Sequence, residues 1–256
     1  MSIQKGDFIE LDYTGKIIED NIIFDTTIPA DAKKAGLIHE HADGEEHHHH
    51  HHLHEEDFKP VVICVGQNHV LPGLDKKIEG LAIGKHEIKL SEEEAFGKKN
   101  SKLLKLIPLT AFKEQKINPH VGLVLNIDNA KGIVRSVSGG RVIVDFNHPL
   151  AGKEVVYTIK INKTVEDSEQ KLKALLTMAR LPYSDLKVEG NKASAKLGFE
   201  IPMELVEPYL DDVKKITGVE LRFVMPESKK DSSETSSKKS SEKTPEKTSA
   251  KKGDSE

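Results

Sequence analysis

The first part of the chain consists of short runs in which apolar and polar residues alternate, separated by Gly, Asn and Asp. Ile9, Leu11 and Tyr13 occupy alternate positions, and residues 155–161 repeat this pattern. Alternation with a period of two is typical of half-buried strands. The unbroken apolar run at residues 61–65 is interpreted as a buried strand. These patterns predict an α+β fold built around an antiparallel sheet.

A short helix is predicted immediately after the buried run. Pro72 suits a first helical turn, because the N–H that proline lacks would have no intrahelical partner there. Residues 87–90 then alternate as a returning strand, and residues 94–97 form a turn with an aromatic side chain. The helix needs a sheet to pack on, since one of its sides is apolar, with Leu74, Ile78 and Leu81. We therefore expect an antiparallel half-barrel sheet wrapped on a short helix.

Four short motifs in the first hundred residues carry the most specific information about the fold. They are Val70-Leu71-Pro72-Gly73-Leu74-Asp75, Ala95-Phe96-Gly97, Phe24-Asp25-Thr26-Thr27, and Tyr13-Thr14-Gly15-Lys16, which is expected to turn the chain. Together and at this spacing they resemble the FK506-binding (FKBP) family of peptidyl-prolyl isomerases. The resemblance implies an FKBP-like isomerase (rotamase) domain made of residues 1–98 and 149–165, which accelerates X–Pro isomerisation in folding proteins.

The same resemblance implies a proline pocket of mostly apolar residues. Asp25 follows an apolar strand and needs a partner if it is buried, so we expect it to orient a tyrosine or a substrate amide. The N–H of Leu71 is the expected anchor for a substrate carbonyl. Leu74 and Phe96 replace a Trp and a Tyr of well-studied members, which implies a shallower floor and one hydroxyl fewer. From spacing alone, Tyr13 and Phe24 are either pocket residues or core packing. The expected catalytic residues are Tyr13, Phe24, Asp25, Val70, Leu71, Leu74, Phe96 and Tyr157, with Val61 as a substrate contact.

Residues 99–148 exceed what a minimal isomerase barrel needs. Strands are predicted at 103–108, 121–128, 131–137 and 141–145, the last two joined by Ser138-Gly139-Gly140. With the exit Asp145-Phe146-Asn147-His148-Pro149-Leu150-Ala151-Gly152, they resemble the insert-in-flap chaperone domain of SlyD-type and archaeal FKBPs. Asn147-His148 is either catalytic or a polar pair that fixes the returning loop. The resemblance implies binding of unfolded polypeptides, for which we expect Ile107, Val124, Val134 and Phe146.

The pattern of apolar and polar residues changes near residue 166, where a further domain is predicted to begin. Helices are predicted at 168–179 and 202–217, with strands at 186–189, 192–197 and 219–224. Residues 166–226 resemble the extra C-terminal α/β domain of archaeal long-type FKBPs. About sixty residues make a thin core, so a homodimer through this domain is plausible. Residues 227–256 are rich in Ser, Lys and Glu and nearly free of apolar side chains, and they are expected to be a disordered charged tail.

Histidines cluster between residues 39 and 54. Neutral imidazoles bind Ni²⁺ and Zn²⁺, but a run of interchangeable ligands fixes no geometry. The histidines are interpreted either as adventitious surface ligands or as a functional metal site. The run of histidines itself is either a natural loop or a purification tag. No cofactor is required by the expected chemistry. The candidate ligands are His47, His48, His49, His50, His51, His52 and His54.

Composition and charge narrow the possible partners and location of the protein. The formal net charge of −4 gives no field that would attract nucleic acid or an anionic membrane. No apolar run approaches the roughly 18 residues that span a bilayer, and no apolar leader begins the sequence, so a cytoplasmic protein is expected. The single Cys64 lies in an apolar run and is interpreted as a buried thiol. The alternatives to an isomerase with chaperone activity are a catalytically weak holdase and a metal-handling protein.

Overall fold

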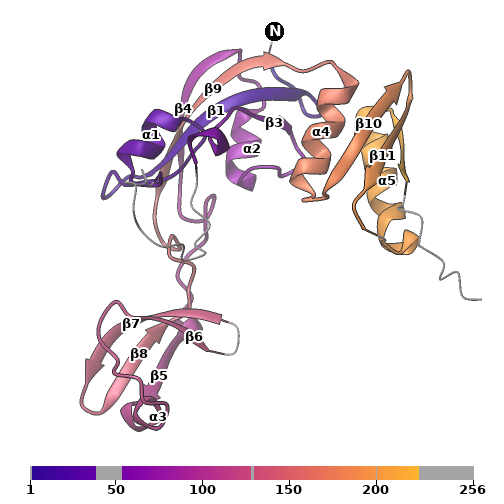
Figure 1. Ribbon diagram of the computed structural model, residues 1–256. Helices are drawn as coiled ribbons and strands as arrows, with labels where there is room; N and C mark the ends of the chain where they lie inside the picture. Colours follow the sequence, from indigo (N-terminus) through magenta and orange to yellow (C-terminus); the bar gives the residue numbers. More distant parts are fainter. Residues whose placement is uncertain (1, 39–53, 128–129, 200, 225–256) are drawn as a thin grey trace, which may run out of the picture.

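The computed structural model describes residues 2–38, 54–127, 130–199 and 201–224, and it is an α+β structure with three sheets (Figure 1). The predicted His-rich loop, except His54, and the predicted tail lie outside the described residues. The first sheet is antiparallel, in the order β2-β1-β9-β4, with β3 also paired to β1. Its strands are β1 (Phe8–Ile17), β2 (Ile23–Thr26), β3 (Val61–Cys64), β4 (Gly84–Leu90) and β9 (Val155–Thr164).

Strand β1 organises this sheet, because it pairs with three other strands. It runs antiparallel to β9 from Ile9 to Ile17, while β3 and β2 pair with the two ends of its other edge. The turn predicted at residues 13–16 is therefore wrong. Thr14 pairs with Thr26 on one side and with Thr158 on the other, and these two ladders keep the backbone extended.

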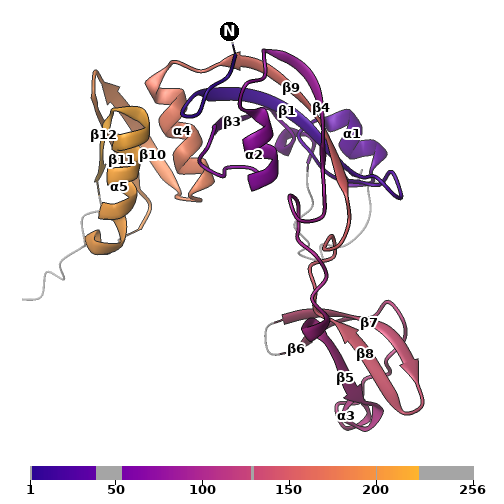
Figure 2. The ribbon, with the colours of Figure 1, turned by 180° about the vertical axis from the view of Figure 1, so that it is seen from behind.

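Helix α2 (Pro72–Ile78) lies across the concave side of the curved sheet, as both ribbon views show (Figures 1 and 2). Leu74 and Ile78 are buried against the sheet, as their spacing predicts. Gly73 brings the helix close to the turn that follows β4, because a Cβ at this position would lie 2.3 Å from the carbonyl oxygen of Glu94. Helix α1 (Pro29–Lys34) follows β2, and short 3-10 turns lie at Glu55–Asp57 and Ser101–Leu103.

A separate four-stranded sheet, in the order β5-β8-β7-β6, lies apart from the first and is joined to it by two chain segments (Figure 1). Its elements are β5 (Leu104–Pro108), α3 (Leu109–Glu114), β6 (Val124–Ile127), β7 (Ala130–Ser138) and β8 (Arg141–Asp145). Its buried core consists of Phe112, Leu125, Val134, Val142 and Val144. Helix α3 is not predicted from the sequence, since six residues are too few to show helical periodicity.

The C-terminal part forms a third, three-stranded sheet in the order β10-β11-β12, with β11 and β12 parallel. Its elements are α4 (Ser168–Met178), β10 (Tyr183–Glu189), β11 (Lys192–Leu197), α5 (Met203–Thr217) and β12 (Glu220–Val224). Asp167 caps α4 by accepting a hydrogen bond from the N–H of Gln170 at 2.9 Å. Leu172 and Leu176 of α4 share one core with Phe8 and Cys64 of the first sheet, so α4 packs on that sheet where β1 and β3 pair.

Replacing Gly73 with Ala tests the close approach between α2 and the turn after β4. The added Cβ meets a backbone oxygen, which cannot move aside as a flexible side chain would. We expect Gly73→Ala to lower the free energy of unfolding by about 1–3 kcal/mol, as overpacking does. Chemical denaturation measures this loss. Gly198→Ala is the matched control, since a Cβ there meets no atom within 4 Å, and equal stability losses in both variants would contradict the explanation.

Candidate functional site

One cavity of about 380 Å³ opens between the first sheet, α2 and the turn after β4. Seven of the eight residues predicted to be catalytic line it, from β1, β9, the end of β2, the loop before α2, α2 itself and the turn at Phe96. Phe24 lies behind the wall, and Val61 packs on the sheet core instead of lining the cavity. The lining residues are Tyr13, Asp25, Asn68, His69, Val70, Leu71, Pro72, Leu74, Phe96 and Tyr157.

Three aromatic rings, those of Tyr13, Phe96 and Tyr157, form one wall of the cavity, and Phe24 supports them from behind. Phe24 packs edge-on against both Phe96, with ring centroids 5.6 Å apart, and Tyr157, at 5.8 Å. Tyr13 and Tyr157 meet at 5.9 Å. Edge-to-face pairs such as the two that Phe24 makes hold aromatic rings in fixed orientations. Gly15 makes room for them, because a Cβ there would lie 2.9 Å from atoms of both Phe24 and Tyr157.

Asp25 is the charged residue at the rim of this wall. The hydroxyl of Tyr13 donates a hydrogen bond to its Oδ2 at 3.1 Å. Desolvation by the surrounding rings raises the pKa of Asp25, while hydrogen bonds from Tyr13 and from the Thr26 backbone oppose this shift. Burial, and then the negative charge of Asp25, raise the pKa of Tyr13. Tyr13 is therefore a neutral phenol that orients the carboxylate.

The loop before α2 is held by a buried carboxylate. Asp75 is only 2% exposed, and its two oxygens accept hydrogen bonds from the N–H of Gly66 at 2.9 Å and of Asn68 at 2.8 Å. Asn68 takes a left-handed backbone conformation, with φ of 56°. Among the described residues, no acceptor is bonded to the N–H of Leu71, which follows this loop. The loop is rigid and still has a free backbone donor.

His69 lies on this loop, and like Asn68 and Pro72 it lines the cavity without having been predicted as a site residue. Its Nδ1 accepts a hydrogen bond from the N–H of Cys64 at 3.0 Å. Burial lowers the pKa of His69, although the negative charge of Asp75 opposes the shift. Cys64 itself is buried, as predicted, and desolvation first and the charge of Asp75 next raise the pKa of its thiol to about 11. Nothing in the sequence indicated that His69 contacts the backbone N–H of Cys64.

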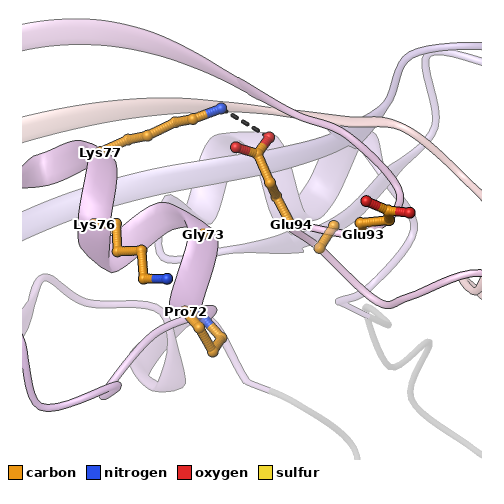
Figure 3. A pocket seen from close by; sticks show the side chains of 7 residues that line it. Pro72, Gly73, Lys76, Lys77, Glu93 and Glu94 are labelled. Carbon is orange, nitrogen blue, oxygen red and sulfur yellow. Dashed lines mark hydrogen bonds and ion pairs between the residues drawn. The ribbon is translucent and has the colours of Figure 1, made fainter.

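A second hollow of about 310 Å³ adjoins the cavity at Pro72 (Figure 3). It lies between α2 and the turn after β4, and charged side chains surround it. Lys77 and Glu94 bridge it with an ion pair of 2.8 Å, drawn as the dashed line in Figure 3. Exposed pairs of this kind contribute about 0–1 kcal/mol. Among the residues that the structure describes, no aromatic side chain lines the hollow, so the aromatic cavity is the better place for an apolar ring.

The two segments that lead to the separate sheet are tied together where they leave the first sheet. Asn147 accepts a hydrogen bond from the N–H of Asn100 at 2.8 Å and donates one to its carbonyl oxygen at 3.1 Å. His148 stacks flat on Phe96, with ring centroids 4.9 Å apart and an interplanar angle of 4°. These contacts favour the interpretation of Asn147-His148 as a pair that fixes the returning loop, next to a residue that lines the cavity.

The residues expected to contact polypeptides lie on different faces of the separate sheet, because side chains alternate between the two faces along a strand. Val134 is 0% exposed in its core, so it offers no surface to a ligand, and that expectation is wrong. Ile107 and Phe146 are half-buried against the same core. Val124 is 61% exposed on the other face. The strand register places it on one face with Leu104, Ile133, Leu106 and Ile143, of which Leu104 and Leu106 are also exposed.

No metal site is found within the described residues, which leave out His47–His52. In the same part of the chain, no helix combines the length and the apolar character needed to cross a bilayer.

Comparison with known proteins identifies the family. Residues 105–150 match the family model described as "FKBP26, IF domain". The chain is 26% identical over 160 residues to the short-type peptidyl-prolyl cis-trans isomerase of Methanocaldococcus jannaschii, covering 62% of this chain and 92% of the relative. It is 31% identical over 110 residues to a probable FKBP-type 16 kDa peptidyl-prolyl cis-trans isomerase of Pseudomonas fluorescens, covering 41% of this chain and 73% of the relative.

A further relative is the FKBP-type isomerase SlyD of Helicobacter pylori, which is 29% identical over 120 residues, covering 45% of this chain and 65% of the relative. A half-barrel with an aromatic cavity and these relatives define an enzyme that acts on prolyl bonds. The chain belongs to the FKBP-type peptidyl-prolyl cis-trans isomerases.

The lowered pKa of His69 predicts a pH-dependent contribution to stability. The folded protein binds the His69 proton more weakly than the unfolded chain, whose histidine pKa is about 6.5. The contribution is therefore fully present above that pH and is lost as the pH falls through the lower pKa of the folded state. Denaturation of wild type and of His69→Asn, which does not titrate, measures the difference. The stability of wild type relative to the variant should fall on acidification, and a constant difference between about pH 7.5 and 5 would contradict the assignment.

Proposed function

We propose that the aromatic cavity is where the isomerase acts, holding a proline ring while the preceding carbonyl rotates. The observation that carries the proposal is the cavity itself, with seven lining residues from the family motifs around one space of about 380 Å³. A ring of proline size fits a site that is mostly aromatic and aliphatic. No nucleophile or general base is needed, since no covalent bond is made or broken.

The chemistry follows from the resonance of the imide bond. Partial double-bond character makes rotation about X–Pro bonds slow, tens to hundreds of seconds at about 25 °C. Hydrogen bonds from water to the imide oxygen favour the planar, charge-separated form. Replacing that water with the rings of Phe96 and Tyr157 removes this stabilisation. A wall of fixed rings then binds the twisted form better than either planar form, which lowers the barrier.

The polar groups at the rim give the substrate its orientation. The free N–H of Leu71 suits a substrate carbonyl next to the prolyl bond. The carboxylate of Asp25, oriented by Tyr13, accepts a hydrogen bond from a substrate amide N–H. Leu74, buried at the start of α2, forms the floor under the proline ring.

We further propose that the separate sheet captures unfolded polypeptides for the cavity. Leu104, Leu106 and Val124 expose apolar surface on one face of this sheet, and Ile133 and Ile143 lie on that face between them. Exposed apolar surface of this kind marks interaction sites. A chain held there has its prolines at a raised effective concentration near the cavity. The contacts of Asn147 and His148 keep the connection to the cavity defined.

Self-association through the C-terminal part is a separate proposal. Phe199, Met203 and Leu205 expose large apolar side chains there, with Leu205 72% exposed. Covering such a surface with a second copy would remove it from water. Light scattering at micromolar concentration is the measurement, with a dimer expected. A strictly monomeric mass would contradict this proposal and leave the isomerase site unaffected.

The role of the rim carboxylate is tested by Asp25→Ala and Tyr13→Phe in an isomerisation assay without a coupled protease. Asp25→Ala removes the acceptor, and we expect kcat/KM to fall about tenfold, which corresponds to the loss of one hydrogen bond to a charged group. Tyr13→Phe leaves the carboxylate but frees it to rotate, so a smaller loss is expected. Asp211→Ala, an exposed carboxylate on α5, is the control. If Asp25→Ala retains the wild-type kcat/KM, this role is wrong.

Capture by the separate sheet is tested with matched surface variants in the full chain. The double variant Leu106→Ser and Val124→Ser removes side chains that are 56% and 61% exposed. The control, Ile22→Ser with Ile83→Ser, removes side chains that are 54% and 53% exposed on the first part of the chain. We expect the first variant to lose about tenfold or more in catalysis of a proline-limited refolding reaction. It should keep its activity on a short peptide, and the control should keep both.

Two outcomes contradict capture. One is an equal loss of refolding catalysis in both double variants, which would indicate a general effect of surface polarity. The other is full refolding catalysis in the first variant. If wild type suppresses aggregation but leaves the slow refolding phase unchanged, the chain acts on polypeptides as a holdase.

A further inference from the structure

The tautomer of His69 is fixed by a backbone contact. A hydrogen bond joins the N–H of Cys64 to Nδ1 of His69 at 3.0 Å. A peptide N–H can only donate, so Nδ1 must present its lone pair, and a neutral imidazole then carries its proton on Nε2. Protonation of the ring would place a second N–H opposite that of Cys64. The neutral form with Nε2–H is therefore the form that this contact selects.

The ring is held in place from both sides of the loop. Cys64 ends β3, a buried strand, and its backbone is fixed by pairing with Phe8 of β1. Asp75 holds the preceding residues through the N–H groups of Gly66 and Asn68. The two imidazole nitrogens point in divergent directions, so Nε2–H is directed away from β3. Within the described part of the chain, Nε2 has no hydrogen-bond partner.

His69 adds a side-chain N–H to the free backbone N–H of Leu71 at the cavity. It lines the cavity together with Leu71, Phe96 and Tyr157. Phe96 carries no donor, and the hydroxyl of Tyr13 is already donated to Asp25. Burial lowers the pKa of His69, which keeps its ring neutral at neutral pH. A rigid, neutral N–H donor at an apolar cavity suits a neutral acceptor, and a peptide carbonyl is the acceptor that every polypeptide offers.

We propose that Nε2–H of His69 binds a backbone carbonyl of the substrate other than the carbonyl of the isomerising bond. A donor on the imide oxygen would stabilise the planar, charge-separated form and oppose rotation. A donor on a flanking carbonyl holds the chain equally in the planar and twisted states, which is uniform binding. His69 is then a substrate-binding residue whose loss raises KM and leaves kcat unchanged. This inference rests on the proposed role of the cavity.

Two substitutions separate the contacts of the two ring nitrogens. In His69→Asn the side-chain oxygen takes the place of Nδ1, so the acceptor for Cys64 remains while the reach to the cavity is lost. In His69→Gln the amide takes the place of Nε2, so a donor remains. With a short prolyl peptide and the full chain, we expect His69→Asn to raise KM about five- to tenfold with kcat unchanged. His69→Gln should recover part of that loss.

The outcomes separate this inference from the proposed function. If wild type is active and Asp25→Ala is impaired, but KM is the same in wild type and His69→Asn, this inference is wrong and the cavity keeps its role. A loss confined to kcat, or equal KM values for the Asn and Gln variants, overturns it as well. If Asp25→Ala and His69→Asn both match wild type, the proposed use of the cavity fails.

Nitrogen-detected NMR of the wild-type chain requires no substitution. The free protein should show His69 as the Nε2–H tautomer, and the Nε2 resonance should shift when a prolyl peptide is added while the Nδ1 resonance stays in place. The opposite tautomer, or an Nε2 resonance unchanged at saturating peptide, overturns the inference even where a variant fails to fold.

Discussion

The cavity depends on one buried carboxylate. Asp75 projects from α2 and accepts the N–H groups of Gly66 and Asn68. A buried charge without partners is costly, so these two bonds are required for the helix and the loop to exist together. They fix the backbone on which His69, Val70 and Leu71 enter the cavity. Removing either partner would leave a buried group unsatisfied, and the wall opposite the aromatic rings would lose its shape.

The opposite wall is rigid for a different reason. Phe24, Phe96 and Tyr157 hold one another by edge-on contacts, and Gly15 leaves the space that their rings occupy. One wall thus consists mainly of aromatic rings, and the other presents the free N–H of Leu71 and the imidazole of His69, which we propose as the groups that bind polypeptide carbonyls. An isomerase needs this division, because the carbonyl that rotates must be kept dry while the flanking chain is held.

Much of this arrangement could be predicted from the sequence, because short motifs encode local structure. Period-two alternation predicted the positions of β1 and β9, and the spacing of Leu74 and Ile78 predicted the buried side of α2. Prediction from the local sequence failed where contacts with distant segments of the chain determine the backbone conformation. Gly15 was expected in a turn, yet two neighbouring strands keep it extended.

The candidate site could likewise be predicted only as far as its residues belong to local motifs. The motif residues were predicted to gather and seven of them line one cavity, whereas His69 could not be found, because its orientation depends on the N–H of Cys64. Val134 and Val124 are alike in sequence, but alternation in the folded sheet buries the first and exposes the second.

The central claim is that the aromatic cavity binds the prolyl bond while it rotates. Two-dimensional exchange NMR of a labelled prolyl peptide with a catalytic amount of the full chain tests it most directly, since the exchange rate and the contacted residues are observed on the same sample. We expect faster cis–trans exchange, together with intermolecular contacts between the proline ring and the side chains of Leu74, Phe96 and Tyr157. Accelerated exchange with contacts confined to another surface, or contacts in the cavity without any acceleration, would contradict it.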